Sequence, residues 1–274
     1  AGECCLWATN DTVVTVRLAG TNTLDASSGG EGLCIENGCR LTVTAAPGFA
    51  DTDAVLVAKG GSSCAAIATG RNNRQAGKSP YFEIAGGTVM ATGGSNSAGI
   101  GGSNQTGKNS AAEMVISGGR VFATGASHAA GIGSSDRAYW GGPAITIIGG
   151  YVEAQGGEGA AGIGGGYDSI IGTCVVRGGT VRASAGPDTL VVRPGRDDRA
   201  ADMLAGHYRA WSDRFEISGG SVCLVHQKVR PQPVFIPSDG SSTQTVWCVT
   251  VEGLEGLVGL EGLEGYGTDG IVAI

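Results

Sequence analysis

The sequence is poor in aromatic residues, in proline and in long apolar runs. Aromatic residues make up 5% of its 274 positions, and there are 8 prolines. No stretch of 18 consecutive apolar residues occurs, so no segment is predicted to span a membrane. Positive charge is also scarce, with 18 Lys and Arg against 25 Asp and Glu. A net charge of −7 argues against a nucleic-acid partner, because phosphates call for a basic surface.

Motifs for metal and redox chemistry are missing as well. The chain has three histidines, none in an H-x-x-x-H or H-E-x-x-H pair, so a catalytic zinc is not supported. None of the eight cysteines forms a C-x-x-C pair. We expect most of them to be small buried core residues. Alternatively, Cys4 and Cys5 are bridged to Cys34 or Cys39 in an oxidising compartment.

Glycine, in contrast, is abundant and periodic. The chain has 51 glycines, and Gly-Gly pairs begin at positions 86, 118, 149, 178 and 219. Each pair is followed two positions later by a valine, and three copies continue into Ala-Gly-Ile-Gly. Collagen has glycine at every third residue, so this longer period excludes it. Self-similarity every 20 to 50 residues indicates a stacked repeat architecture.

Apolar residues two positions apart recur within each repeat, which places each pair on one face of a strand. One strand carries Phe82 and Ile84 or their equivalents, a second carries Val89 and Ala91, and a third carries Ile100 alone. Ile67 lies 33 residues before Ile100 and begins the third series. Gly-Gly pairs suit the corners between strands. The Ala-Gly-Ile-Gly wall is almost bare of side chains, so another group is expected to approach its backbone closely.

These patterns predict an all-β fold, a three-sided parallel β-helix with coils of about 31 residues. It should cover residues 1–230, with irregular coils over 1–80 and regular repeats over 81–225. An excursion at 186–214 interrupts the repeats. Within it, Leu190 and Val192 would replace the missing isoleucine, and 198–210 would form a short helix or leave the coil as an excursion. Residues 231–274 are predicted to form a small C-terminal β cap, because a solenoid needs its ends covered.

Acidic residues near the third wall and in the excursion are the candidates for chemistry. A pair of carboxylates could act on a glycosidic bond, acidic loops could equally hold calcium, and each acid could simply be solvated. The candidates are Asp136, Glu158 and Asp168 near the third wall, and Asp197, Asp198 and Asp202 in the excursion. Aromatic residues in the same regions could stack on sugar rings or only pack. These are Tyr139, Trp140, Tyr167, Tyr208 and Trp211, with Arg196 beside them.

The repeats Gly-Gly-Thr-Val-x-Ala-Thr-Gly-Gly followed by Ala-Gly-Ile-Gly-Gly resemble those of secreted bacterial carbohydrate-binding β-helix proteins, over roughly residues 12–225. The ending from Tyr266 is also similar to a segment that trails such repeats. The resemblance implies a right-handed, pectate-lyase-like helix that binds polysaccharide, sometimes with calcium, at the surface of anaerobic bacteria. The excursion at 186–214 departs from the pattern and puts a plain binding role in doubt there.

Three functions follow as hypotheses. The first is a secreted or cell-surface module that binds a polysaccharide along one wall without catalysis. The second is a glycoside hydrolase or polysaccharide lyase that uses the acids near the excursion. The third is a structural or adhesive protein that self-assembles through its solenoid ends or tail strand. The start at Ala1-Gly2, without Met, suits a mature secreted chain or a trimmed one.

Overall fold

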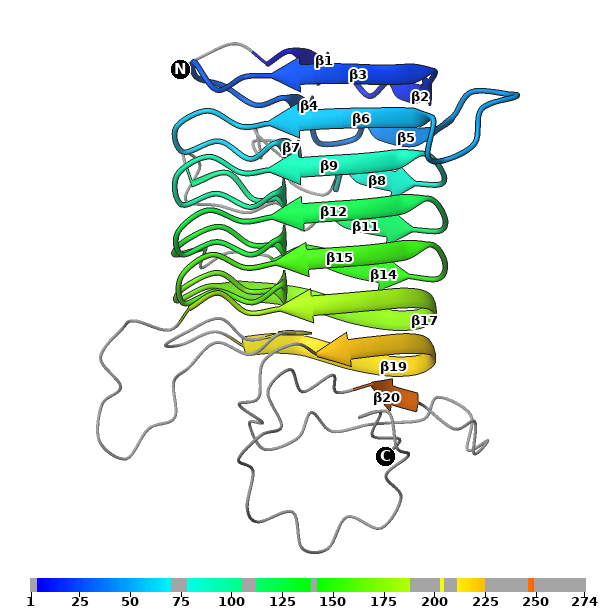
Figure 1. Cartoon of the computed structure of the whole chain (residues 1–274). Helices are drawn as coiled ribbons and strands as arrows, with labels where there is room; N and C mark the ends of the chain where they lie inside the picture. Colours follow the sequence, from blue (N-terminus) through cyan, green and yellow to red (C-terminus); the bar gives the residue numbers. More distant parts are fainter. Residues whose placement is uncertain are drawn as a thin grey trace, which may run out of the picture.

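The computed structural model of the chain describes residues 4–69, 78–104, 112–138, 142–187, 203–204, 211–224 and 246–248. These residues form β-strands and connecting turns, and no α-helix occurs among them. The strands wind into coils stacked along one axis, from β1 and β3 at one end to β19 and β20 at the other (Figure 1). The predicted parallel β-helix is confirmed.

Each coil contributes strands to three walls. The first wall contains β2 (Val13–Leu18), β5 (Arg40–Ala45), β8 (Tyr81–Ile84), β11 (Glu113–Ile116) and β14 (Ala144–Ile147). The second contains β3 (Gly20–Asp25), β6 (Ala54–Lys59), β9 (Thr88–Thr92), β12 (Arg120–Thr124) and β15 (Tyr151–Gln155). Two longer strands, β17 (Ile170–Ser184) and β19 (Trp211–Leu224), run through both walls and join them into one sheet. This sheet has 13 strands and includes β20 (Val246–Cys248), which pairs with β19.

The third wall is a separate sheet of seven short strands. They are β1 (Leu6–Ala8), β4 (Leu33–Ile35), β7 (Ile67–Thr69), β10 (Ile100–Gly101), β13 (Ile132–Gly133), β16 (Ile163–Gly164) and β18 (Met203–Leu204). All strand pairs in the two sheets are parallel. Each strand therefore bonds to its equivalents in the coils before and after it.

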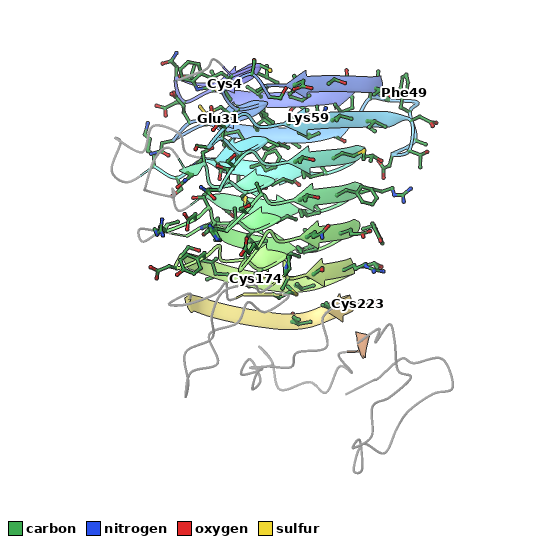
Figure 2. All side chains as sticks on the ribbon, turned by 60° about the vertical axis from the view of Figure 1, so that its left-hand side comes forward. Cys4, Glu31, Phe49, Lys59, Cys174 and Cys223 are labelled. Atoms are coloured by element: carbon green, nitrogen blue, oxygen red, sulfur yellow. The ribbon has the colours of Figure 1, made fainter. Side chains whose placement is uncertain are left out.

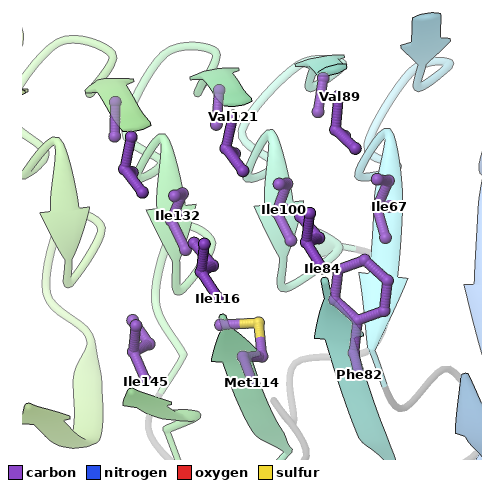
Figure 3. Close-up of a cluster of buried hydrophobic side chains, with 14 of the residues drawn as sticks. Ile67, Phe82, Ile84, Val89, Ile100, Met114, Ile116, Val121, Ile132 and Ile145 are labelled. Carbon is purple, nitrogen blue, oxygen red and sulfur yellow. The ribbon is translucent and has the colours of Figure 1, made fainter. Parts of the chain in front are cut away.

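The stacking register is the one that the repeats predict. Phe82 aligns with Met114 on the first wall, and Val89 with Val121 on the second. On the third wall Ile67, Ile100, Ile132 and Ile163 align in succession. These inward side chains are almost completely buried and form one continuous core along the axis (Figure 3). On the first and second walls inward positions alternate with outward ones, so these strands present their remaining side chains toward solvent.

Gly-Gly pairs form the corners between the first and second walls. The second glycine of each pair has a positive φ, between 74° and 83° at Gly87, Gly119, Gly150, Gly179 and Gly220. A side chain at these positions would be strained, so the pairs recur because the corner requires them. The prediction for the corners is confirmed.

The third wall is held together by close backbone contact. A Cβ added to Gly133 would lie 1.9 Å from the carbonyl oxygen of Gly164, and one added to Gly101 would lie 2.0 Å from that of Gly133. The group that approaches this bare wall is therefore the next coil of the same chain. The glycines serve the stacking of coils.

Two strands lie at least partly within the range 186–214 that was predicted for the excursion, β18 and the start of β19. Met203 and Leu204 pair with Ile163 and Gly164, so Met203 takes the place of the missing isoleucine. The prediction of Leu190 and Val192 for this role was wrong, and both lie outside the described residues. Residues 203–204 form a strand, although they lie in the segment predicted as a short helix or an excursion. The chain returns to the first wall at Trp211, where β19 begins and pairs with β17. The step from Ile163 to Met203 is 40 residues, against 31 from Ile132 to Ile163, and the nine extra residues are tolerated because loop-closure entropy grows slowly with length.

At the C-terminal end, the described part of the predicted cap continues the second wall. Val246, Trp247 and Cys248 pair in parallel with Ser221, Val222 and Cys223. Residues 225–245 and 249–274 lie outside the described part, so the boundary at 231 and the tail strand stay predictions.

The described cysteines other than Cys248, whose side chain is not described, are thiols, so the predicted bridge from Cys4 or Cys5 is wrong. Cys4 instead donates a hydrogen bond from Sγ to Glu31 Oε2 at 3.3 Å, at the opposite end of the solenoid from Cys174 and Cys223 (Figure 2). Cys34, Cys39, Cys64 and Cys174 are buried, as expected of core residues. Burial raises the pKa of Cys174 to about 12, which makes this thiol unreactive.

Candidate functional site

The structure describes four of the predicted site residues completely: Asp136, Glu158, Tyr167 and Asp168. Trp211 belongs to β19, and its side chain is not described. The remaining predicted site residues lie outside the described part of the chain, namely Tyr139, Trp140, Arg196, Asp197, Asp198, Asp202 and Tyr208. Because the predicted residues of the excursion are not described, the candidate site is built from the third wall and the residues around it.

Three of the predicted residues, Asp136, Tyr167 and Asp168, meet at one place together with His128 and Arg137. We call these five residues the third-wall corner. Its frame is backbone, since the Tyr167 N–H donates to the His128 carbonyl and the Arg137 N–H donates to the Tyr167 carbonyl, both at 2.9 Å. The rings of His128 and Tyr167 lie 5.3 Å apart, and the Arg137 guanidinium lies 5.8 Å from the Tyr167 ring. Glu158 meets the corner through its backbone carbonyl, which accepts from the His128 N–H at 3.0 Å.

The backbone of the third-wall corner is strained. His128, Arg137 and Asp168 have φ values of 63°, 50° and 48°, in the left-handed region that costs an L-residue roughly 1–2 kcal/mol. Asn96, which matches His128 one coil earlier, has a φ of 57°. Strain that is held at several neighbouring residues is a feature of functional sites, although the tight turns here also require it.

Asp136 is the most unusual residue of the corner. It is 5% exposed, and its Oδ1 has no hydrogen-bond partner, while Oδ2 lies 3.4 Å from Nη1 of Arg137. Burial raises the pKa of the Asp136 carboxyl, the charges of Arg137 and His128 oppose this shift, and Asp168 adds to it. A buried carboxyl with a raised pKa is the state that a general acid needs.

The corner contains a histidine and two aspartates, but they are not arranged as a metal site. Within the described part of the chain, no group of three or more His, Cys, Asp or Glu side chains is arranged to hold a metal ion. The calcium expected as one alternative for the acidic loops thus has no support from the described third wall.

A second cluster lies on the outward face of the second wall. We call it the second-wall platform and define it as Met90, Arg120, Phe122, Tyr151, Glu153 and Arg182. Strands β9, β12, β15 and β17 bring these residues together, because Met90, Phe122, Glu153 and Arg182 align in successive coils, as do Arg120 and Tyr151.

Aromatic and charged groups alternate on the platform. The Phe122 and Tyr151 rings lie 5.8 Å apart at 47°, with the Arg120 guanidinium 5.6 Å and 5.8 Å from their centroids. The Tyr151 hydroxyl donates to Glu153 Oε2 at 3.0 Å, and Glu153 Oε1 lies 3.8 Å from Nε of Arg182. Met90 is 46% exposed. The pKa of Tyr151 is raised mainly by burial and, to a smaller extent, by the hydrogen bond to Glu153, so its hydroxyl keeps the proton.

Sequence reasoning did not select the platform, because no residue type recurs at its positions. A signal was nevertheless present. The residues that alternate with the inward Val121 and Ala123, or with Val152 and Ala154, must point outward. Comparing these outward positions coil by coil would have placed Phe122 beside Tyr151.

Three segments of the chain, residues 82–104, 115–136 and 145–167, match the family model described as the beta helix repeat. They cover β8 to β10, β11 to β13 and β14 to β16, which are the regular coils. The chain therefore contains beta helix repeats within its parallel β-helix. Comparison with curated proteins and with solved structures gives no match. Among the described residues, no helix is long and apolar enough to cross a membrane.

Proposed function

We propose that this β-helix repeat protein is a non-catalytic module that binds polysaccharide through the second-wall platform, outside the cell. The observation that carries the proposal is the Phe122–Tyr151 pair on an outward sheet face, flanked by Arg120 and Glu153. Aromatic rings offer flat apolar surface to the faces of sugar rings. The neighbouring guanidinium and carboxylate groups can bond to sugar hydroxyls and orient the chain.

Accessibility favours the platform over the third-wall corner as the binding surface. Arg120 is exposed, and Phe122, Tyr151, Glu153 and Arg182 are each partly exposed. Tyr167 is also partly exposed, but it already contacts His128 and Arg137, and Asp136 below it is nearly inaccessible. A polysaccharide needs a surface that it can reach without rearrangement of the wall.

The test is affinity of the purified chain for a panel of soluble and insoluble polysaccharides, measured by depletion and by the shift in melting temperature. Phe122→Ala and Tyr151→Ala should each weaken binding to the retained glycan about tenfold. Tyr81→Ala is the matched control, because Tyr81 also lies under an arginine, at 3.8 Å from Arg40, and donates to a glutamate, Glu83. It lies on the first wall, where no second ring pairs with it among the residues that the structure describes. Equal loss in all three variants, or no binding to any glycan, would contradict the proposal.

A second candidate function is hydrolysis at the third-wall corner, favoured by the raised pKa of Asp136 beside Asp168. In that case Asp136 would protonate the leaving oxygen of a glycosidic bond. The assay is release of reducing ends, and of products absorbing at 235 nm, from the same panel with and without calcium. Product that disappears in Asp136→Asn but persists in Phe122→Ala would replace the binding module by an enzyme.

A further inference from the structure

We infer that the platform binds an extended, linear polysaccharide lying parallel to the solenoid axis, with about one sugar ring over each coil. This inference rests on the proposed function and adds the shape and direction of the ligand. Its basis is the regularity of the second wall, which repeats the same outward positions from coil to coil.

The outward side chains form straight columns across five strands. From β6 to β17, Val57, Met90, Phe122, Glu153 and Arg182 are register partners in successive coils, with no register shift between them. Neighbouring strands lie about 4.8 Å apart, close to the length of one pyranose ring. A sugar chain along the axis would therefore meet one residue of this central column per ring.

The other direction offers far less contact. A strand of the second wall such as β12 presents three outward residues, Arg120, Phe122 and Thr124. The Gly118–Gly119 corner precedes it, and Gly125 begins the next turn. A sugar chain along the strand would leave the wall after these three residues. A flat wall therefore favours a long ligand along the axis.

Polar residues flank the central column on both sides. Arg120, Tyr151 and Thr180 align on one side, and Thr92, Thr124 and Gln155 align on the other. Their hydroxyl, guanidinium and amide groups can bond to the equatorial edges of sugar rings stacked over the column. The column itself changes along the axis from apolar Val57 and Met90, through Phe122, to charged Glu153 and Arg182. This gradient gives the site a direction and distinguishes one end of a bound chain from the other.

The experiment is calorimetric titration of the whole chain with oligosaccharides of two to eight rings, made from the polysaccharide that binds best. Affinity should rise with each added ring up to about five, the number of strands that the column crosses, and remain constant beyond. Met90→Ala and Arg182→Ala, near the two ends of the column, should reduce affinity for five rings more than affinity for two rings.

Binding along the strands predicts the opposite pattern. Affinity would then stop rising at two or three rings, and His128→Ala, beyond the end of β12, would weaken binding whereas Arg182→Ala would not. That result would overturn the inference while leaving the proposed function intact, provided that Phe122→Ala still weakens binding. Failure of every oligosaccharide and of the parent polysaccharide to bind would reject the proposed function itself.

Discussion

The second and third walls come from the same repeats but are stabilised in different ways. The second wall has strands of five or six residues from β3 to β15, and its regular coils have inward valine and alanine with outward side chains of every kind. In the regular coils the third wall has strands of two residues, and its glycines allow adjacent coils to touch through backbone atoms. The second wall can therefore vary its outer surface freely, whereas the third can hardly vary at all.

This difference assigns different roles to the two walls. Residues on the outer face of the second wall contribute little to the core, so they are available for recognition. The third wall couples the coils and carries strained turns with the buried Asp136. Its residues are constrained first by packing, and any role in chemistry has to be compatible with that packing.

The largest expected effect is that of Gly133→Ala. The new Cβ would collide with the Gly164 carbonyl, and the φ of 140° is unfavourable for alanine. We expect either loss of cooperative folding or destabilisation of more than about 4 kcal/mol, measured by urea unfolding. Gly48→Ala is the control, because Gly48 also has a positive φ but no atom lies within 4 Å of its added Cβ. Its cost should be about 1–2 kcal/mol. A similar loss of unfolding free energy in both variants would show that the third wall can accommodate a Cβ atom at Gly133.

The next effect compares inward and outward side chains. Ile132→Ala removes a buried side chain from the third wall and should reduce the free energy of unfolding by about 2–5 kcal/mol. Phe122→Ala on the outer face of the second wall should reduce it by no more than about 1 kcal/mol. If Phe122→Ala costs as much as Ile132→Ala, the platform is part of the core packing and its role in recognition loses its basis.

A smaller effect, and one of opposite sign, is the gain in stability expected from His128→Gly. Glycine relieves the left-handed backbone of the third-wall corner, which should stabilise the chain by up to about 1 kcal/mol. Asn96→Gly at the matching position of the previous coil should gain less, because asparagine tolerates this conformation better than histidine. Thermal unfolding of both variants measures the difference. A loss in His128→Gly alone would mean that the ring contact with Tyr167 supports the fold.

The smallest effect is a change in pH dependence. Because burial raises the pKa of folded Asp136, its protonated form is favoured in the folded state. Its contribution to stability is therefore greatest below the usual pKa near 4 and is lost as the pH rises through the raised value. Asp136→Asn should gain stability relative to the parent chain between pH 4 and pH 7, as measured by urea unfolding at each pH.

Asp25→Asn provides a control of opposite sign. Hydrogen bonds from Ser27, with Lys59 nearby, lower the pKa of Asp25 to about 2. Its contribution is present above the usual pKa and is lost as the pH falls toward 2. Asp25→Asn should therefore lose stability at neutral pH relative to acid. The same slope in both variants would contradict the burial of Asp136.

Much of the fold could be predicted from local patterns. Spacing by two identifies the inward residues of each strand, and the Gly-Gly pairs identify the corners where positive φ is needed. The replacement of the third-wall isoleucine by Met203 could not be predicted, because an insertion of any length can precede the residue that fills the position. The close approach to the third-wall backbone was predicted, but its partner, the glycines of the adjacent coil, was not, because that partner is remote in the chain.

The candidate site was predicted only in part. Asp136, Tyr167 and Asp168 were selected because they follow the third-wall isoleucines, and the structure does bring them together. Nothing in the sequence indicated that Asp136 would be 5% exposed, because its burial depends on turns from neighbouring coils. Phe122 and Tyr151 were overlooked, because a pattern of outward residues carries meaning only when the coils are aligned.

The sequence by itself determined that the chain coils into a three-sided β-solenoid and which residues face its core, because period-two apolar residues and paired glycines are local requirements of strands and corners. The tertiary structure decided which outward side chains become neighbours. Phe122 and Tyr151 are 29 positions apart, and only the parallel stacking of coils places their rings 5.8 Å from each other. That contact depends on a register between coils, which hydrogen bonds between distant segments establish.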